Sequence, residues 1–212
     1  SGDAGSVELR RSGEEPSISR AQLENVERTL VMNRLEGLVE EMGDQLQRTA
    51  LSTNIRERLD FSCALMDAEG RLLVNAPHIP VHLGAMGLCV RESVKELKPL
   101  PGDVIITNHP GYGGSHLPDV TLITAVHDDD QQLIGYLANR AHHAEWGGTS
   151  PGSMPADATS LMEEGVVIAP TWLIRQGRDC FAEIESLLKE SPFPSRAPRE
   201  NRIDLEAQLA SL

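Results

Sequence analysis

The chain has 212 residues, of which 40% are hydrophobic and 24% charged, so it can bury a sizeable core and is not a disordered or collagenous protein. Its formal net charge of −13 repels phosphate backbones, which argues against general nucleic-acid binding. No apolar stretch approaches the ~20 residues of a membrane helix, and residues 1–30 carry no signal-like block, so we expect a cytoplasmic protein without a membrane partner.

The first predicted element is a long helix. Residues 1–17 are rich in Gly, Ser, Glu and Arg without an apolar period, so we expect a disordered linker or an N-terminal extension. Ser19 and Gln22 form a capping box, which predicts that the helix begins there. Apolar side chains then recur at three- and four-residue steps, at Leu23, Val26, Leu30, Val31, Leu35, Leu38, Val39, Met42 and Leu46. This stripe predicts a long helix packed on a core or on a partner.

Strands and shorter helices follow the long helix. Alternating or short apolar runs predict strands at 61–66, 72–75, 104–107, 120–126, 133–138 and 166–174. Helices are expected at about 83–97 and from Phe181, and residues 191–212 are expected to be a linker and the start of a truncated helix. Because strands and helices alternate without a regular βαβ rhythm, we predict an α+β fold with a mixed sheet or sheets, a long N-terminal helix and further packed helices.

The cysteines indicate neither a disulfide framework nor a zinc ribbon. The chain has three cysteines, Cys63, Cys89 and Cys180, which is an odd number, and no two of them form a CxxC pair. We therefore expect reduced and mostly buried thiols.

Candidate catalytic chemistry is concentrated in the middle of the chain. All seven histidines lie between His78 and His143, less than a third of the chain. His116 and Asp119 form an HxxD pair, and His142-His143 follows the strand expected to pair back against it. Two imidazoles and a carboxylate suit a catalytic zinc, manganese or ferrous ion, and the alternative is that they are hydrogen-bonded loop residues. Adjacent histidines on an extended segment point to opposite faces, so only one of the pair is expected to bind the metal.

Other polar residues extend this candidate site. Glu145 could support a ligand histidine or act as a general base. Arg56 or Arg58 could bind a substrate carboxylate, and the alternative is a solvated salt-bridge cluster. His78 and His82 flank Ile-Pro-Val and could line a pocket or orient a ligand, with a structural role as the alternative.

Two motif searches exclude simpler enzymes. Residues 148–152, GTSPG, match the GxSxG nucleophile pattern, but Pro151 has no N–H to donate to an oxyanion, so we reject a serine hydrolase. Neither GxxxxGK[ST] nor GxGxxG occurs, so any ATP in the reaction must be held by another polypeptide or domain.

A series of ordered motifs resembles the hydantoinase B family. They are STNIRER (52–58), DFSCA (60–64), NAPHIPVHLG (75–84), PGD (101–103), GGSHLPD (113–119), HHAEWGG (142–148) and PGSMP (151–155). The family includes the C-terminal half of ATP-dependent 5-oxoprolinase, B subunits of ATP-dependent hydantoinases and one subunit of acetone carboxylase. The motif Asn108-His109-Pro110 and the SHLPD segment are most similar to the 5-oxoprolinase branch.

The resemblance implies a larger assembly. Residues 18–190 would be the N-terminal metal-bearing region of a hydantoinase B-like fold. The implied partners are the remainder of the B half and a hydantoinase A-like subunit or domain, which would hold ATP-Mg. Because hydantoinase B chains run well beyond twice this length, we expect a fragment, a split-gene product or a short paralogue that is inactive alone. Glu145 and Trp146 depart from the usual aspartate and isoleucine or valine of the family, which would alter the surroundings of the ligands.

The resemblance also implies a reaction and the residues that perform it. ATP would phosphorylate the lactam oxygen of 5-oxo-L-proline on the A half, and a metal that activates water or polarises the amide would help to open the ring to L-glutamate. Carried over by position, the ligands are His116, Asp119 and His142. The proton shuttle would be His109, Glu145 or His143, and Arg56 or Arg58 would hold the substrate carboxylate. Alternatives are a B subunit of a hydantoinase or acetone carboxylase-type enzyme and a non-catalytic assembly module.

Overall fold

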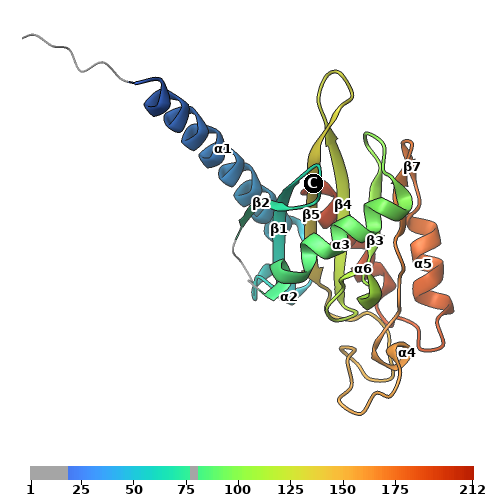
Figure 1. Cartoon of the computed structure of the whole chain (residues 1–212). Coiled ribbons are helices and arrows are strands. Elements are labelled where there is room, and N and C mark those ends of the chain that lie inside the picture. Colours follow the sequence, from blue (N-terminus) through green and yellow to red (C-terminus); the bar gives the residue numbers. More distant parts are fainter. Residues whose placement is uncertain (1–18, 77–80) are drawn as a thin grey trace, which may run out of the picture.

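The computed structural model describes residues 19–76 and 81–212, and its centre is a seven-stranded sheet (Figure 1). The strands are β1 (Phe61–Asp67), β2 (Leu72–Ala76), β3 (Val104–Thr107), β4 (Asp119–His127), β5 (Leu133–His142), β6 (Thr171–Arg175) and β7 (Arg178–Asp179). Their order across the sheet is β2-β1-β5-β4-β3-β6-β7. The predicted α+β class is confirmed, but the sheet is antiparallel throughout rather than mixed, because strands that follow one another in the chain mostly pair directly.

Helices account for most of the remaining chain. They are α1 (Arg20–Thr49), α2 (Thr53–Arg56), α3 (Val81–Leu97), α4 (Leu161–Glu164), α5 (Phe181–Glu190) and α6 (Pro198–Ala210), with a 3-10 turn η1 at Pro110–Tyr112. The predicted capping box is confirmed, since the Ser19 hydroxyl accepts the N–H of Gln22 and the Gln22 side chain accepts the N–H of Ser19. Predictions for residues 1–17 and for His78 lie outside the described residues. None of the helices in the described ranges combines the length and the apolar character needed to cross a membrane.

Helices cover both faces of the sheet. On one face Ile105 packs in a buried cluster with Met86 of α3. On the other face Ile106, the next residue along β3, packs in a cluster with Ile184 of α5 and Leu205 of α6. Successive side chains of a strand point to opposite faces, so continuous apolar strands are expected where both faces are buried. Truncating one of these side chains to alanine typically costs about 2–5 kcal/mol.

The long helix α1 packs only part of its length on this body. Val39 and Leu46, in its C-terminal half, are buried together with Phe61 of β1. Leu23 and Leu30, in its N-terminal half, are 50% and 57% exposed. Figure 1 shows this half projecting away from the sheet. The predicted apolar stripe therefore serves the core over its second half, and its first half stays exposed in the part of the chain that the structure describes.

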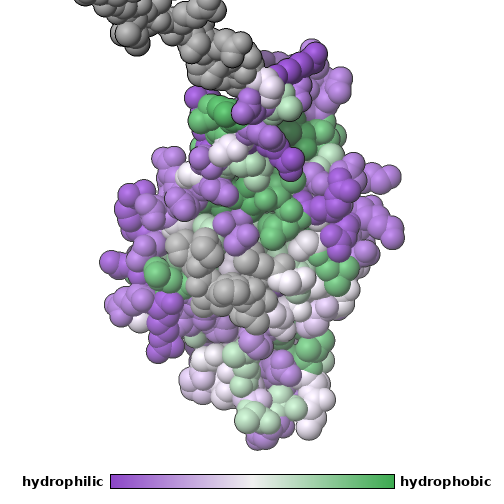
Figure 2. All heavy atoms as spheres, turned by 60° about the vertical axis from the view of Figure 1, so that its left-hand side comes forward, coloured by the Kyte–Doolittle hydropathy of each residue, from purple (hydrophilic) through white to green (hydrophobic). Residues whose placement is uncertain are grey.

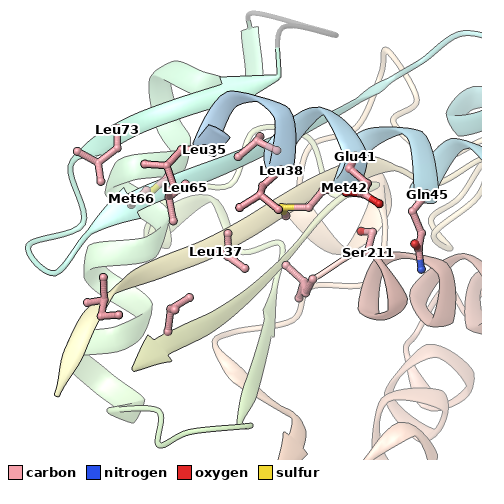
Figure 3. Close-up of a pocket in the computed structure, with 14 residues that line it drawn as sticks. Leu35, Leu38, Glu41, Met42, Gln45, Leu65, Met66, Leu73, Leu137 and Ser211 are labelled. Carbon is pink, nitrogen blue, oxygen red and sulfur yellow. The ribbon is translucent and has the colours of Figure 1, made fainter. Parts of the chain in front are cut away.

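An apolar groove of about 480 Å³ lies between α1 and the sheet. Its lining includes Leu38, Met42, Leu73, Ile134, Leu137 and Leu212, drawn from α1, β2, β5 and the last residue of the chain (Figure 3). Figure 2 shows hydrophobic side chains gathered on the side of the molecule that carries α1. Leu38 and Ile134 are more than half exposed, at 58% and 57%. Exposed apolar surface of this kind commonly marks a contact with another polypeptide.

The strand predicted at 166–174 is wrong in its first half, because β6 begins only at Thr171. Val166 and Ile168 are buried, so the apolar run reflects burial rather than strand pairing. The Asn108 side chain supplies the missing partners: its Nδ2 donates to the Val166 carbonyl at 2.8 Å, and its Oδ1 accepts the Ile168 N–H at 2.7 Å. A side-chain amide thus satisfies the backbone where a neighbouring strand would otherwise do so.

Helix α6 is integrated into the same core as the residues before it. Leu205 packs with α5, and Asp204 is buried. The Oδ1 atom of Asp204 accepts the N–H groups of Leu51 and Ser52 at 2.6 and 3.1 Å. These bonds tie α6 to the segment that joins α1 to α2.

Candidate metal centre

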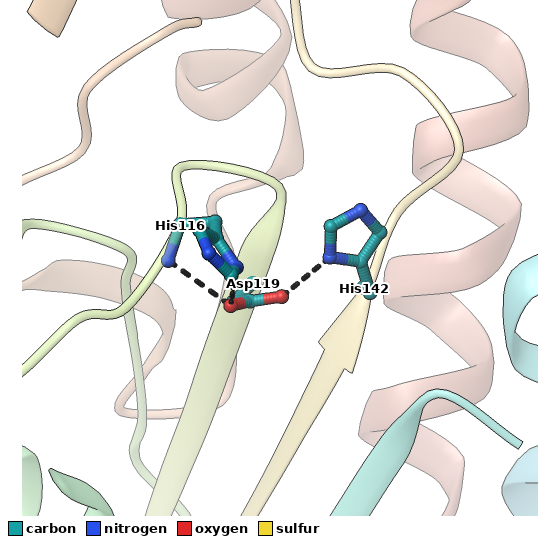
Figure 4. Close-up of side chains that lie close together, drawn as sticks. All are labelled: His116, Asp119 and His142. Carbon is teal, nitrogen blue, oxygen red and sulfur yellow. Dashed lines mark hydrogen bonds and ion pairs between the residues drawn. The ribbon is translucent and has the colours of Figure 1, made fainter. Parts of the chain in front are cut away.

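His116, Asp119 and His142 meet at one end of the β4–β5 hairpin (Figure 4). Asp119 is the first residue of β4 and His142 the last of β5, and the antiparallel register makes them direct cross-strand partners. His116 lies three residues before Asp119, in the loop that leads into β4. One ligand atom from each residue lies within 4.8 Å of the other two. These are the three residues expected from the sequence to bind the metal.

The Asp119 carboxylate lies at the centre of the group and is fully buried. Its Oδ1 atom lies 2.6 Å from Nδ1 of His142. Its Oδ2 atom accepts the Ser115 hydroxyl at 2.7 Å and the His116 N–H at 3.0 Å, and lies 3.1 Å from Nδ1 of His116. The carboxylate is therefore held in one orientation, with a different set of partners for each oxygen.

These contacts shift the pKa values of both partners. Burial raises the pKa of the Asp119 carboxyl, but hydrogen bonds from His142, Ser115 and the His116 backbone lower it by more. The resulting pKa is well below the ordinary value of 3.8. Burial lowers the pKa of His142, but the hydrogen bond and charge of Asp119 outweigh this effect. The resulting pKa of His142 is above the ordinary value of 6.5. Asp119 is thus ionised at neutral pH, and a metal ion would compete with protons for His142.

The donor set and its exposure fit a catalytic metal ion. Ligands of one ion with bonds of about 2.1 Å lie about 3–4 Å apart, so atoms already within 4.8 Å need little movement. The His116 side chain is 59% exposed, whereas that of His142 is 14% exposed. Two imidazoles and one carboxylate with one open side match a catalytic zinc, manganese or ferrous site better than a closed structural one.

The second histidine of the pair points the other way, as predicted. Nε2 of His143 lies 2.9 Å from Oε1 of Gln208 on α6, and its ring meets Trp146 edge-on, with the centroids 4.7 Å apart. His143 is fully buried, and burial lowers its pKa. This position in the core does not support the predicted role of His143 as a proton shuttle, because the ring has no direct path to solvent.

The other two shuttle candidates, Glu145 and His109, are engaged elsewhere. The Oε2 atom of Glu145 accepts the Ser195 hydroxyl at 2.7 Å and the Arg196 N–H at 3.0 Å, so this carboxylate holds the segment before α6. Nδ1 of His109 accepts the Gly111 N–H at 2.9 Å and caps η1. Neither residue belongs to the group of three possible ligands.

The predicted substrate-binding residues differ in how they relate to this group. Arg56 and Arg58 are both exposed. The charge of Arg58 contributes to lowering the pKa of His142, which places it near the site. His82 lies in the first turn of α3, and His78 lies outside the described residues.

Two neighbours of Asp119 were not singled out from the sequence, namely Ser115 and Arg140. Arg140 is fully buried on β5, two residues before His142 and therefore on the same face of the strand. Its Nη1 donates to Ser115 Oγ at 3.4 Å, and Ser115 in turn donates to Asp119. No local pattern in the sequence distinguishes Arg140 from an ordinary strand residue, because its contacts depend on the strand register.

Among the described residues, neither the cysteines nor the loop at 148–152 offers a competing nucleophilic site. All three cysteines are buried and unpaired, as predicted, and burial raises the pKa of Cys63 to about 12. Residues 148–152 form a loop without the strand-turn-helix arrangement of a nucleophile elbow. The metal group is therefore the arrangement that best supports chemistry.

Comparison with known proteins identifies the family of this chain. The family model described as Hydantoinase B/oxoprolinase matches residues 24–212. The 5-oxoprolinase of Saccharomyces cerevisiae is 44% identical over 211 residues, covering 96% of this chain and 16% of its own length. 5-oxoprolinase 1 of Arabidopsis thaliana is 45% identical over 215 residues, covering 93% of this chain and 17% of its own length. The crystal structure of ATP-dependent caprolactamase from Pseudomonas jessenii matches with a TM-score of 0.77 at 27% identity, covering 88% of this chain and 32% of that one.

Proposed function

Because the chain belongs to the hydantoinase B/oxoprolinase family, we propose that it is the metal-bearing part of an ATP-dependent 5-oxoprolinase-like amidohydrolase. The reaction would convert 5-oxo-L-proline, ATP and water to L-glutamate. The observation that carries the proposal is the group of His116, Asp119 and His142 at the end of the hairpin. The identity of 44% and 45% to two 5-oxoprolinases supports this substrate. The structural likeness to an ATP-dependent caprolactamase supports a cyclic amide more generally.

The three side chains would hold a divalent manganese, zinc or ferrous ion. Such an ion supplies a Lewis acid that can polarise an amide carbonyl or activate water. Asp119 contributes a fixed negative charge, since its carboxylate is ionised and held through both oxygens. A metal ion would compete with protons for His142, and the exposed side of His116 leaves room for substrate.

Arg58 is the better candidate for binding the carboxylate of 5-oxo-L-proline. It is exposed, so its guanidinium can meet a ligand, and its charge already acts on His142. A guanidinium can donate two parallel hydrogen bonds to a carboxylate. Arg56 is equally exposed but ends α2, and no such link to the metal group supports it.

ATP-Mg would be held by a hydantoinase A-like partner. The sequence contains no phosphate-binding loop of the GxxxxGK[ST] or GxGxxG type. We therefore expect the 212-residue chain alone not to hydrolyse ATP.

The remainder of a hydantoinase B half would cover the apolar groove and the exposed half of α1. The chain spans about a sixth of the length of the two 5-oxoprolinases and about a third of the caprolactamase chain, so each of these relatives carries much more polypeptide. The groove is lined mainly by leucine, isoleucine, valine and methionine, which suits an apolar polypeptide segment rather than a polar ligand.

The proposal is tested on the assembled enzyme. The chain, joined with the remaining B half and a hydantoinase A-like partner, would be assayed with ATP on 5-oxoproline, on hydantoin, and on acetone with bicarbonate. We expect glutamate from 5-oxoproline; turnover of hydantoin alone, or of acetone alone, would instead favour one of the two related enzyme classes. A non-catalytic assembly module would show no turnover of any substrate and the same metal content in wild type and His116→Ala.

A further inference from the structure

Arg140 is a fully buried cation beside the candidate metal centre. Its Nε donates to the Thr121 hydroxyl at 2.8 Å and its Nη2 to the Gly113 carbonyl at 2.9 Å. Its Nη1 donates to Ser115 Oγ at 3.4 Å. Within the described residues the guanidinium makes no ion pair with a carboxylate, although a buried charge without compensation is costly.

The nearest negative charge along these bonds is that of Asp119. Ser115 Oγ donates to Oδ2 of Asp119 at 2.7 Å, so one hydroxyl separates the guanidinium from the carboxylate. The strand register places two cross-strand pairs side by side. Thr121 faces Arg140 across the hairpin, and the neighbouring pair on that face is Asp119 and His142. All four residues lie on the same face, because they are two positions apart on each strand.

We infer that Arg140 and Ser115 form a positioning relay that fixes the Asp119 carboxylate for metal binding; this inference rests on the metal site of the proposed function. A guanidinium can only donate hydrogen bonds, so Ser115 Oγ must accept from Arg140. The single hydroxyl proton is then directed to Oδ2 of Asp119. The arginine sets the direction of the hydroxyl, and the hydroxyl sets the orientation of the carboxylate.

The relay distinguishes the two carboxylate oxygens. Oδ2 is occupied by the Ser115 hydroxyl and the His116 N–H, whereas Oδ1 faces His142. Engaging Oδ2 in this way fixes the plane of the carboxylate, with Oδ1 toward His142 and Oδ2 3.1 Å from Nδ1 of His116. Groups that orient metal ligands in this way commonly change metal affinity by about 10–100-fold when removed.

The experiment measures Mn²⁺ binding to the whole 212-residue chain by titration calorimetry, together with the electron paramagnetic resonance spectrum of the bound Mn²⁺. Ser115→Ala should raise the Kd about 10-fold and alter the spectrum while leaving the melting temperature nearly unchanged, because Ser115 is exposed. Ser115→Thr keeps the hydroxyl and should restore both. The matched control is Ser186→Ala, which removes a serine-to-carboxylate bond of 2.6 Å on α5 and should change neither.

A double-mutant cycle tests whether Arg140 acts through Ser115. Arg140→Lys should also weaken Mn²⁺ binding, and the double variant should bind no more weakly than Ser115→Ala alone. Additive losses would overturn the relay, as would a Ser115→Ala affinity within about twofold of wild type. If Arg140→Lys does not fold, the Ser115→Ala and Ser115→Thr pair decides the matter. Failure of the wild type to bind Mn²⁺ would overturn the metal site itself, whereas normal wild-type binding with an unaffected Ser115→Ala would overturn the relay alone.

Discussion

Asp119 and His142 are direct cross-strand partners, and Oδ1 of the aspartate lies 2.6 Å from Nδ1 of the histidine. The distance between two of the three candidate ligands is therefore set by the antiparallel register of β4 and β5 rather than by a loop. A one-residue slip of that register would turn His142 to the opposite face. Sites built on paired strands are held more rigidly than sites on loops.

The first prediction concerns the stability of the metal-free protein as the pH changes. Because the pKa of His142 is raised above 6.5 in the folded state, its contribution to stability is fully present below pH 6.5 and is lost as the pH rises through the folded value. The melting temperature measured in a chelator should therefore contain a component that falls as the pH rises above 6.5. His142→Gln should remove that component.

Asp119→Asn provides a second check on the same prediction, because Asp119 is the main cause of the raised pKa of His142. It should flatten the same region of the pH profile. An unchanged profile in both variants would show that the Asp119–His142 contact does not govern the ionisation of His142.

The second prediction separates Glu145 from the metal site. Glu145→Gln should lower the free energy of unfolding by about 1–3 kcal/mol, because Ser195 and the Arg196 N–H lose a charged acceptor. The Mn²⁺ affinity should stay within about twofold of wild type. The control is Glu57→Gln, an exposed position. If Glu145→Gln instead weakened Mn²⁺ binding and left the free energy of unfolding unchanged, Glu145 would belong to the metal site.

The third prediction concerns the buried polar contacts between α6 and the sheet. Oε1 of Gln208 contacts Nε2 of His143. Nε2 of Gln208 donates to the Val120 carbonyl at 3.0 Å and to Asn139 Oδ1 at 2.9 Å. Gln208→Leu leaves these groups unpaired in the core and should cost about 2–4 kcal/mol in urea unfolding. Arg199→Ala, at an exposed position on the same helix, should cost little. Equal effects of the two changes would contradict this account of α6.

Local patterns in the sequence predicted most of the elements, because local chemistry determined them. The capping box at Ser19 and Gln22 placed the start of α1, and alternating or continuous apolar runs placed β1 to β4 within one residue of their observed bounds. The strand predicted at 133–138 ends four residues too early, because β5 continues to His142. The run at 166–174 was misjudged, since burial without strand pairing leaves the same apolar pattern. The side-chain amide of Asn108 replaces the strand, and no local pattern reveals a partner that distant in sequence.

The candidate site was predicted in part for the same reason. Opposite orientations for His142 and His143 follow from strand geometry, which predicted that only one of them joins the candidate site; the choice of His142 came from the family resemblance. The surroundings of Glu145 were not, because its partners lie about 50 residues away on the segment before α6. Arg140 resembles an ordinary strand residue until the register sets it beside Asp119 and His142.

The fourth prediction tests the apolar surface. Leu38, which lines the groove, is 58% exposed, whereas its neighbour Val39 is 1% exposed. Leu38→Ser should leave the melting temperature almost unchanged, lower the binding of an apolar fluorescent dye and weaken association with the remaining B half. Val39→Ser should instead lower the free energy of unfolding by about 2–4 kcal/mol. Unchanged dye binding and unchanged association in Leu38→Ser would argue against the groove as the contact surface.

The most direct test of the central claim is the Mn²⁺ content and affinity of the purified chain, compared among wild type, His116→Ala, Asp119→Asn and the control His127→Gln. His127 lies at the opposite end of β4 from Asp119, so it reports on nonspecific effects of losing a histidine from the same hairpin. We predict about one ion per wild-type chain, roughly 100-fold weaker binding in His116→Ala and Asp119→Asn, and unchanged binding in His127→Gln. Equal metal content in all four proteins, or none in the wild type, would contradict the proposed metal centre.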